Sequence, residues 1–401
     1  MQQINIITEQ ELSKFREETS GTSENIHLNN AGSSLNPNIV VDTVINYLRE
    51  EAIVGGYEAE FKYKQELDYT YDLIARLINS ERDEIAIVEN ASTASGLAYN
   101  GIRFKAGDVI ITSEMEYVTN LIGFIHLKKI KGIKMHVIPN DEHGNFQLQA
   151  LEDAIAADTK LIAITHIPST SGTVLPIIEI GKIARKYGVL YMVDACQTVG
   201  QMPIDVKEIG CDILSVTGRK YLRAPRGTGF LFVKKEIQDQ LELLLIDGHT
   251  AELTSEDSYQ IRADGRRFEL YEKSRALTLG LGKAVEYALT IGVDRIWQRI
   301  HLLAEEMRSQ LKKIEGVTIH DSGTLQCGIV TFSVNGLASQ VIKAELSEKN
   351  INVSVGLARS TFFYMNKNEL VDVVRASVHY YNTNDEIELL CKALTAITGN
   401  Y

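Results

Sequence analysis

Short apolar runs alternate with amphipathic stretches between about residue 84 and residue 233 of the chain. Runs of this kind predict buried strands, and the amphipathic periodicity between them predicts helices. The expected helices are Thr93–Asn100, Thr119–Lys131 and Ile177–Tyr187, and the expected strands are Glu84–Val88, Asp108–Thr112, Lys134–Ile138, Leu161–His166, Val189–Asp194, Asp212–Thr217 and Gly229–Val233. Strands that alternate with helices are typical of βαβ units, so we predict an α/β fold whose mainly parallel central sheet carries helices on both faces.

The pattern changes toward the C-terminus, where a long helical stretch, Leu277–Ile314, precedes a mixed region. That region predicts a smaller α+β domain with strands Val317–His320, Gly328–Val334, Asn352–Val355 and Val373–Ser377 and helices Ser339–Lys349 and Asp385–Ile397. Amphipathic helices are also expected at 40–52 and 64–79. The boundary is expected near this long helix, with a large domain, 31–285, and a small C-terminal domain, 286–401. An N-terminal segment, 1–30, is expected to join the small domain. The polar stretch Asp247–Arg267 is long for an idle loop and is interpreted as functional or interfacial.

Composition and charge narrow the class of protein. The chain has 401 residues, 44% hydrophobic and 23% charged, which is ordinary for a globular protein. A net charge of −12 argues against nucleic acid or an anionic membrane as a partner. No apolar run is long enough to span a bilayer, and no metal-ligand spacing is visible among the nine histidines and four cysteines. The scattered cysteines predict no disulfides, and we expect a cytoplasmic protein.

Three polar features follow predicted strands. Asp194 ends one strand and Lys220 follows another, while the small-residue turn Asn90–Gly96 connects a strand to a helix. Alone, each has an ordinary explanation: a helix cap, a solvated surface lysine, or a common N-terminal turn. Together they lie at the carboxyl ends of candidate parallel strands, where α/β sheets bind ligands.

A lysine amine in such a place can form a Schiff base with a carbonyl compound. Pyridoxal 5′-phosphate supplies that carbonyl, and its ring is an electron sink that works best when its nitrogen is protonated. Asp194 suits the contact with that nitrogen, and Ser92 and Thr93 suit a phosphate at a helix N-terminus.

From His27-Leu-Asn-Asn-Ala-Gly32 to Arg375-Ala-Ser-Val-His-Tyr-Tyr-Asn-Thr383, the chain resembles the class V aminotransferase family of fold-type I pyridoxal-phosphate enzymes, which includes the cysteine desulfurases. The resemblance implies that Lys220 forms the internal aldimine and acts on the α-proton, and that Tyr117 stacks on the ring and can protonate a leaving group. It assigns the cofactor to Ser92, Thr93, Tyr117, Ser169, Asp194, Gln197, Thr217, Arg219 and Lys220. It assigns the substrate, a small amino acid, to Asn30, Arg359 and Arg375, and it implies a homodimer with the active site near the interface.

Departures from the family pattern suggest the reaction. The segment Ser354–Lys367 has no cysteine, although the resemblance places the nucleophilic cysteine of desulfurases there. An arginine-rich stretch, Arg219–Gly229, and the variant Asp264–Glu272 resemble the branch that contains ergothioneine-pathway C–S lyases and isopenicillin N epimerase-like proteins. We therefore expect β-elimination from a cysteine-derived substrate, and not the persulfide chemistry of a cysteine desulfurase. An aminotransferase or an epimerase is the alternative, and a non-catalytic regulatory protein is an alternative of another class.

Four additional arginines stand out in this acidic chain. They are Arg223, Arg226, Arg266 and Arg267. They suit either an acidic ligand or ion pairs at a dimer interface, and the sequence favours neither.

Overall fold

The computed structural model describes residues 6–399, and its largest sheet has seven strands in the order β2-β8-β7-β6-β5-β3-β4. Its strands are β2 (Ile85–Val88), β3 (Val109–Ser113), β4 (Lys134–Ile138), β5 (Thr159–Thr165), β6 (Leu190–Asp194), β7 (Ile213–Thr217) and β8 (Gly229–Val233). The pairs from β4 to β7 are parallel, and β8 is antiparallel to both of its neighbours, β2 and β7. β2 therefore runs in the same direction as β6 and β7, and their carboxyl ends share one edge of the sheet.

Alternate residues of these strands belong to two separate apolar clusters. Ile85 and Ile87 of β2 join a large cluster, whereas Ala86 and Val88 join a smaller one. Successive side chains of a strand point to opposite faces, so the two clusters are the two faces of the sheet. The helices α5 (Ala91–Gly101) and α6 (Val118–Lys131) cover one face, and α4 (Lys64–Ile78), α8 (Ile177–Tyr187) and α10 (Arg275–Ile291) contribute to the other. Burial on both faces explains why the strands are continuous apolar runs and confirms the predicted α/β architecture.

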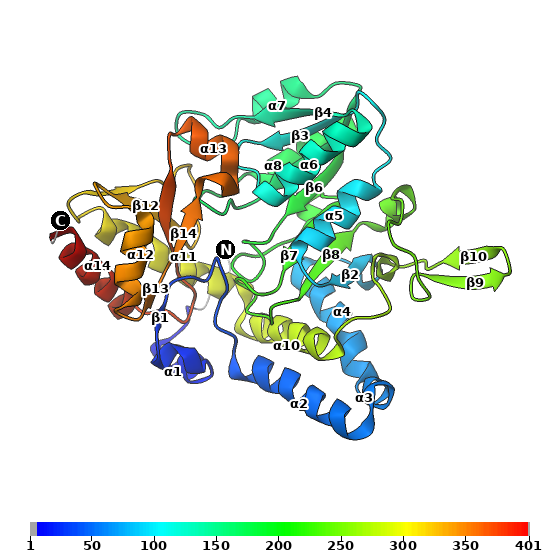
Figure 1. Ribbon diagram of the computed structural model, residues 1–401, viewed down its shortest axis with the longest axis horizontal. Helices are drawn as coiled ribbons and strands as arrows, with labels where there is room; N and C mark the ends of the chain where they lie inside the picture. The colour runs from blue at the N-terminus through cyan, green and yellow to red at the C-terminus, as the bar shows by residue number, and fades with distance from the viewer. Residues whose placement is uncertain (1–5, 400–401) are drawn as a thin grey trace.

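A second sheet lies at the C-terminal end of the chain, on the left in Figure 1. Its strand order is β11-β12-β15-β14, with β11 (Val317–Ile319), β12 (Ile329–Val334), β14 (Ser354–Leu357) and β15 (Asp372–Ser377) all antiparallel. Helices α11 (Val293–Leu311), α12 (Ser339–Ser347), α13 (Phe362–Lys367) and α14 (Asn384–Gly399) accompany it. The predicted domain boundaries at 30/31 and 285/286 stay a prediction.

The N-terminal segment lies against this C-terminal region. The short strand β1 (Ile26–His27) pairs in parallel with β13 (Ile351–Asn352), and α1 (Glu9–Glu17) is close to α14. Arg16 donates hydrogen bonds to the carbonyl oxygen of Tyr381 (2.9 Å) and to Glu386 (2.8 Å). The remaining helices are α2 (Asn38–Val54), α3 (Gly56–Lys62), α7 (Leu148–Ala154) and α9 (Val206–Ile209).

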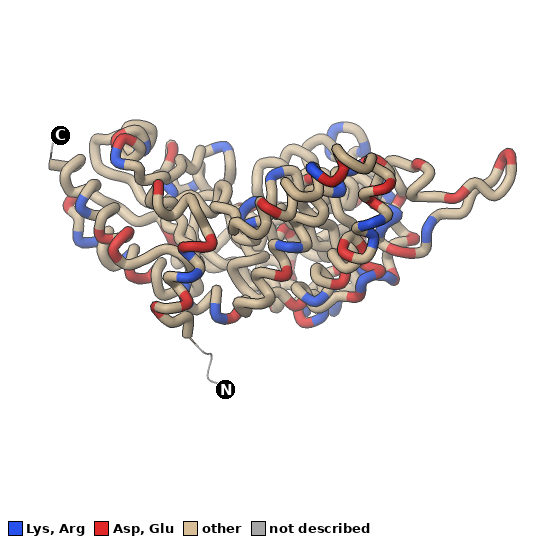
Figure 2. The backbone as a smooth tube through the Cα atoms, turned by 90° about the horizontal axis from the view of Figure 1, so that it is seen from below, with Lys and Arg blue, Asp and Glu red and all other residues tan. Residues whose placement is uncertain are grey.

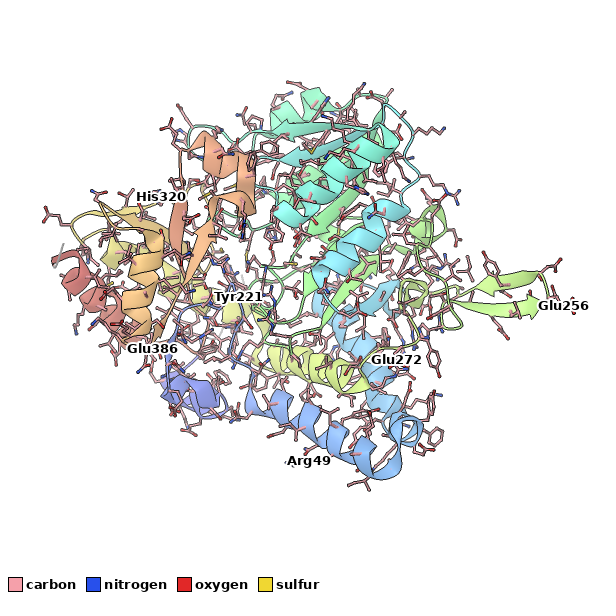
Figure 3. The ribbon with its side chains drawn as sticks, viewed as in Figure 1. Arg49, Tyr221, Glu256, Glu272, His320 and Glu386 are labelled. Atoms are coloured by element: carbon pink, nitrogen blue, oxygen red, sulfur yellow. The ribbon has the colours of Figure 1, made fainter. Side chains whose placement is uncertain are left out.

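Two predicted elements differ in the structure. The single helix expected over Leu277–Ile314 is wrong, because α10 and α11 meet at Gly292 with an angle of 78° between them. Gly292 has φ of 93°, a left-handed conformation that a glycine adopts without the penalty of a Cβ atom. The polar stretch Asp247–Arg267 contains a hairpin, β9 (Ala251–Ser255) and β10 (Ser258–Ile261), that projects from the molecule, with Glu256 at its tip (Figure 3).

Charged residues of both signs are interspersed over both parts of the molecule (Figure 2). Among residues 6–399 no single helix has the length and apolar character to cross a membrane; the bent pair α10 and α11 meets those two criteria together.

Candidate active site

A cavity of about 370 Å³ opens where β6 and β7 end and where α5 and α6 begin. Six of the predicted cofactor residues line it: Ser92, Tyr117, Ser169, Asp194, Gln197 and Lys220. The other lining residues are Ala91, Ser95, Thr119, Asn120, Thr165, Ile167 and Cys196. The carboxyl edge of the sheet thus brings together groups that lie far apart in the sequence. Tyr221, next to Lys220, is near the centre of the molecule in Figure 3.

Lys220 provides the amine of this cavity. Its Nζ lies 5.9 Å from the centre of the Tyr117 ring and makes no hydrogen bond or ion pair with any residue between 6 and 399. Burial, helped by the nearby cations Arg219 and Arg375, lowers the pKa of Lys220 to about 8 against the opposing effects of Cys196 and Asp194. An amine with such a pKa is partly neutral near physiological pH, and the neutral form is the nucleophile.

Asp194 holds its carboxylate at the end of β6 through two hydrogen bonds. Its Oδ1 accepts the backbone N–H of Cys196 (2.9 Å), and its Oδ2 accepts Nδ2 of Asn120 (3.2 Å). Asn120 also donates to Oε1 of Glu116 (2.9 Å), a fully enclosed carboxyl group whose pKa is raised by burial. The sequence reasoning missed Glu116 and Asn120. Their spacing of one helical turn around Tyr117 is the signal that could have found them.

Two buried polar atoms in the cavity wall have no partner. Oγ of Ser169 and Oε1 of Gln197 are inaccessible to solvent and accept or donate no hydrogen bond within the described chain. Buried polar groups are normally paired, so these atoms indicate a ligand with complementary polar groups. Together with the Lys220 amine and the Asp194 carboxylate they fit pyridoxal phosphate, which offers an aldehyde, a phenolic oxygen and a ring nitrogen.

The phosphate end of the site follows the first turn of α5. The side chain of Asn90 caps this helix by accepting the N–H of Thr93 at 2.9 Å. Ser92 faces the cavity, whereas Thr93 lines a neighbouring cavity of about 490 Å³. Thr217 and Arg219 are outside the cavity lining, and the Arg219 guanidinium donates to the carbonyl oxygen of Gly32.

The three predicted substrate residues occupy different environments. Arg375 is adjacent to the cavity, because its Nη1 donates to the carbonyl oxygen of Ser169 (2.8 Å) and its Nε to Oγ of Ser354 (3.0 Å). Burial lowers the pKa of Arg375 to about 10, so it remains a cation at neutral pH. Asn30 is fully buried and bonded to backbone and to Tyr381, and Arg359 is exposed. Of the three, only Arg375 makes a hydrogen bond, among the described residues, to a residue that lines the cavity.

The four additional arginines do not form one group. Arg266 pairs with Asp68 (3.4 Å) and Arg267 with Asp239 (2.5 Å), both within this chain. Arg223 is buried and donates to the carbonyl oxygen of Leu35 (2.8 Å) and to hydroxyl groups, while its guanidinium lies over aromatic rings. Arg226 is exposed. Within the described residues, therefore, Arg223, Arg266 and Arg267 have structural partners.

Comparison with known proteins shows the family of the chain. The protein family described as aminotransferase class-V matches residues 26–390. A probable cysteine desulfurase from Methanothermobacter thermautotrophicus is 32% identical, with 94% of this chain and 95% of the relative covered. One from Pyrococcus abyssi is also 32% identical, with 92% of each covered. The apo structure of cysteine desulfurase from Thermococcus onnurineus superposes with a TM-score of 0.92 at 28% identity over the full length of both chains.

A mainly parallel α/β sheet that encloses a lysine amine beside a strand-end aspartate defines the fold-type I class of pyridoxal-phosphate enzymes. The chain belongs to the aminotransferase class-V family of that class, as the resemblance predicted. Family membership confirms pyridoxal 5′-phosphate as the expected cofactor.

The comparisons contradict the expected reaction. The prediction of a C–S lyase, with an aminotransferase, an epimerase or a non-catalytic protein as alternatives, is wrong, because the relatives that match nearly the whole chain are named cysteine desulfurases. The exclusion of a desulfurase rested on one missing side chain between Ser354 and Lys367. A single position weighs less than similarity over 94% of the chain. Nothing in the comparisons shows the ergothioneine-lyase branch.

Proposed function

We propose that this protein is a pyridoxal-phosphate-dependent cysteine desulfurase, which takes the sulfur atom from L-cysteine and leaves L-alanine. The observation that carries the proposal is the enclosure of the Lys220 amine with Asp194 in one cavity, in a chain that matches a probable cysteine desulfurase over 94% of its length. When bound, the cofactor supplies an electron sink for negative charge that develops at the substrate's α-carbon.

Several residues of the cavity would hold that cofactor. Lys220 would attach its aldehyde, and Asp194, kept in orientation by Asn120, would contact its ring nitrogen. Ser169 and Gln197 would bind ring substituents with their unpaired oxygens. Ser92, at the start of α5, would bind the phosphate together with the N-terminal end of the helix dipole, and Thr93, Thr217 and Arg219 are the further candidates nearby.

Arg375 binds the substrate carboxylate. Within residues 6–399 its guanidinium has no carboxylate partner, although it is a buried cation, and two of its nitrogens are fixed by Ser169 and Ser354. A buried cation gains most from a charged partner, and an amino acid's carboxylate provides one. This contact orients the substrate, and Lys220, once free, moves the proton at the α-carbon. Tyr117 lies beside Lys220, where its ring would cover the cofactor and its hydroxyl could donate a proton.

We also propose a homodimer in the cytoplasm, with the active site near the interface. Large apolar side chains are exposed on α2 and α3, among them Ile53 (80%), Tyr57 (72%) and Phe61 (81%). Exposed apolar groups of this size on neighbouring helices are typical of association surfaces. Sedimentation of the purified chain at several concentrations tests this proposal.

The proposed reaction is tested with the purified chain, loaded with pyridoxal phosphate, in L-cysteine and dithiothreitol. Alanine and sulfide are expected in equal amounts, and Lys220→Ala is expected to abolish both while retaining the fold by circular dichroism. Lys14→Ala, on the exposed face of α1, is the matched control and keeps full activity. Pyruvate in place of alanine, or no product from cysteine at any pH, would contradict the proposal.

A further inference from the structure

The fate of the sulfur atom depends on which thiols can reach the cavity. The chain has four cysteines, and three of them lie outside the cavity lining. Cys211 and Cys327 are buried in the core, where burial raises the pKa of Cys327 to about 12. Cys391 is half-buried on α14, and burial raises its pKa to about 11. None of the three presents a thiolate, the reactive form, to the substrate.

Cys196 lines the cavity, but its environment suppresses its reactivity. Its backbone N–H donates to Oδ1 of Asp194 at 2.9 Å, and its side chain is 9% exposed. Burial, and next the charge of Asp194, raise the pKa of the Cys196 thiol well above its usual value. The group is therefore a protonated thiol and a poor nucleophile at neutral pH.

The segment of the smaller sheet that borders the cavity carries hydroxyl groups and no thiol. Ser354 of β14 accepts a hydrogen bond from Arg375, and Oγ1 of Thr361 contacts Oγ1 of Thr170, next to the cavity residue Ser169. The whole of Ser354–Lys367 lacks cysteine. A hydroxyl group cannot carry sulfane sulfur as a thiol can, so this border cannot accept the sulfur atom.

We propose that the sulfur acceptor is a low-molecular-weight thiol from solution. The enzyme then has two substrates, L-cysteine and this thiol, and the persulfide that forms dissociates from the enzyme. This inference rests on the proposed desulfurase function. The polar groups around the reacting atoms are buried, with Asp194 6% and Gln197 3% exposed, so the substrate's sulfur atom would lie in a recess that a small thiol can enter and that the surface of a folded protein cannot.

The step balances without an oxidant. The acceptor loses its proton and its sulfur atom bonds to Sγ of the substrate cysteine. The bond between Cβ and Sγ breaks, its electron pair stays on Cβ, and Cβ takes up a proton. The products are L-alanine and the persulfide of the acceptor.

The test is a single turnover with the holoenzyme in excess over ³⁵S-labelled L-cysteine, so that a second cysteine molecule is scarce. Alanine is expected only when dithiothreitol or unlabelled L-cysteine is added, and the label is then expected on the added thiol after desalting. These two arms distinguish a foreign small thiol from a second substrate molecule. Peptide mass spectrometry is expected to find no persulfide on the peptide that contains Cys196, and Cys391→Ala is expected to react as the parent does.

Three results would overturn the inference. The first is alanine formed without added thiol, together with label bound to the protein, and the second is a persulfide on any of the four cysteines. The third is alanine formed when reduced serum albumin supplies the thiol but not when dithiothreitol does. Absence of alanine under every condition would instead remove the proposed desulfurase function, so the two failures are distinguishable.

Discussion

Asn120 joins two buried carboxyl groups at the bottom of the cavity. One Nδ2 group donates to Oδ2 of Asp194 and to Oε1 of Glu116. Glu116 also accepts from Thr112 (2.8 Å) and from Thr165, so its position is determined by three surrounding elements, β3, β5 and α6. Satisfied buried networks are rigid, and this one keeps the Asp194 carboxylate aimed into the cavity before any ligand arrives.

The lowered pKa of Lys220 predicts how cofactor uptake depends on pH. With a pKa of about 8, the neutral amine is roughly one-tenth of the total at pH 7 and nine-tenths at pH 9. The rate at which the cofactor-free chain takes up pyridoxal phosphate, followed by absorbance, should rise roughly tenfold over that range and then level off. A rise that continues steeply above pH 9 would be that of an ordinary exposed lysine and would contradict the assigned environment.

For single residues, the sequence predicts which residues form the site better than it predicts where each side chain points. Asp194, Gln197 and Lys220 lie at or after the carboxyl ends of neighbouring parallel strands, which share one edge of the sheet. Their proximity could therefore be predicted. Ser92 and Thr93 could not be separated, because successive side chains in a helical turn point about 100° apart. Only the packing of the helix in the structure shows that Ser92 faces the active-site cavity and Thr93 the neighbouring cavity.

Among the elements, the apolar runs of the large sheet were predicted to within two residues, because burial on both faces leaves little choice of side chain. The hairpin β9–β10 was not predicted, since its side chains are mostly exposed and polar and carry no clear alternation. The break between α10 and α11 was also missed, because one glycine in a helical pattern is compatible with a continuous helix.

Replacement of Gly292 tests that break. A Cβ atom at φ of 93° is strained, and Gly292→Ala should lower the free energy of unfolding by about 1–3 kcal/mol. Gly56→Ala is the matched control, because a Cβ there has no neighbour within 4 Å and its backbone is not left-handed. Urea unfolding of both variants measures the difference. Equal stability of the two variants would show that the glycine conformation is not required.

At the scale of the whole molecule, the two ends of the chain stabilise one another. β1 pairs with β13, and the backbone N–H of Ser377 donates to the carbonyl oxygen of Leu28 at 2.7 Å. The expectation that residues 1–30 join the C-terminal part came from family resemblance. Patterns of single residues do not encode a pairing across more than 300 positions, which is why local periodicity could not show it.

Replacement of Arg16 tests how much the association of the two chain ends contributes to stability. Arg16→Met removes its bonds to Tyr381 and Glu386 and leaves a nearly buried carboxylate short of a partner, so we expect a loss of about 1–3 kcal/mol in unfolding free energy. Lys14→Met on the same helix removes only an exposed pair with Glu18 and should change stability by less than about 0.5 kcal/mol. Thermal unfolding of the two variants gives the comparison, and a similar melting temperature would argue against a role for Arg16.

The pairing of β1 with β13 has a consequence for synthesis on the ribosome. The partner strand of Ile26–His27 is Ile351–Asn352, so β1 leaves the ribosome long before its partner and must wait for β13 before it can pair. The large sheet, complete by Val233, can form in the meantime, because folding during synthesis proceeds from the N-terminus in units. The residues of β1 are thus made well before the large sheet is complete and are among the last to be placed.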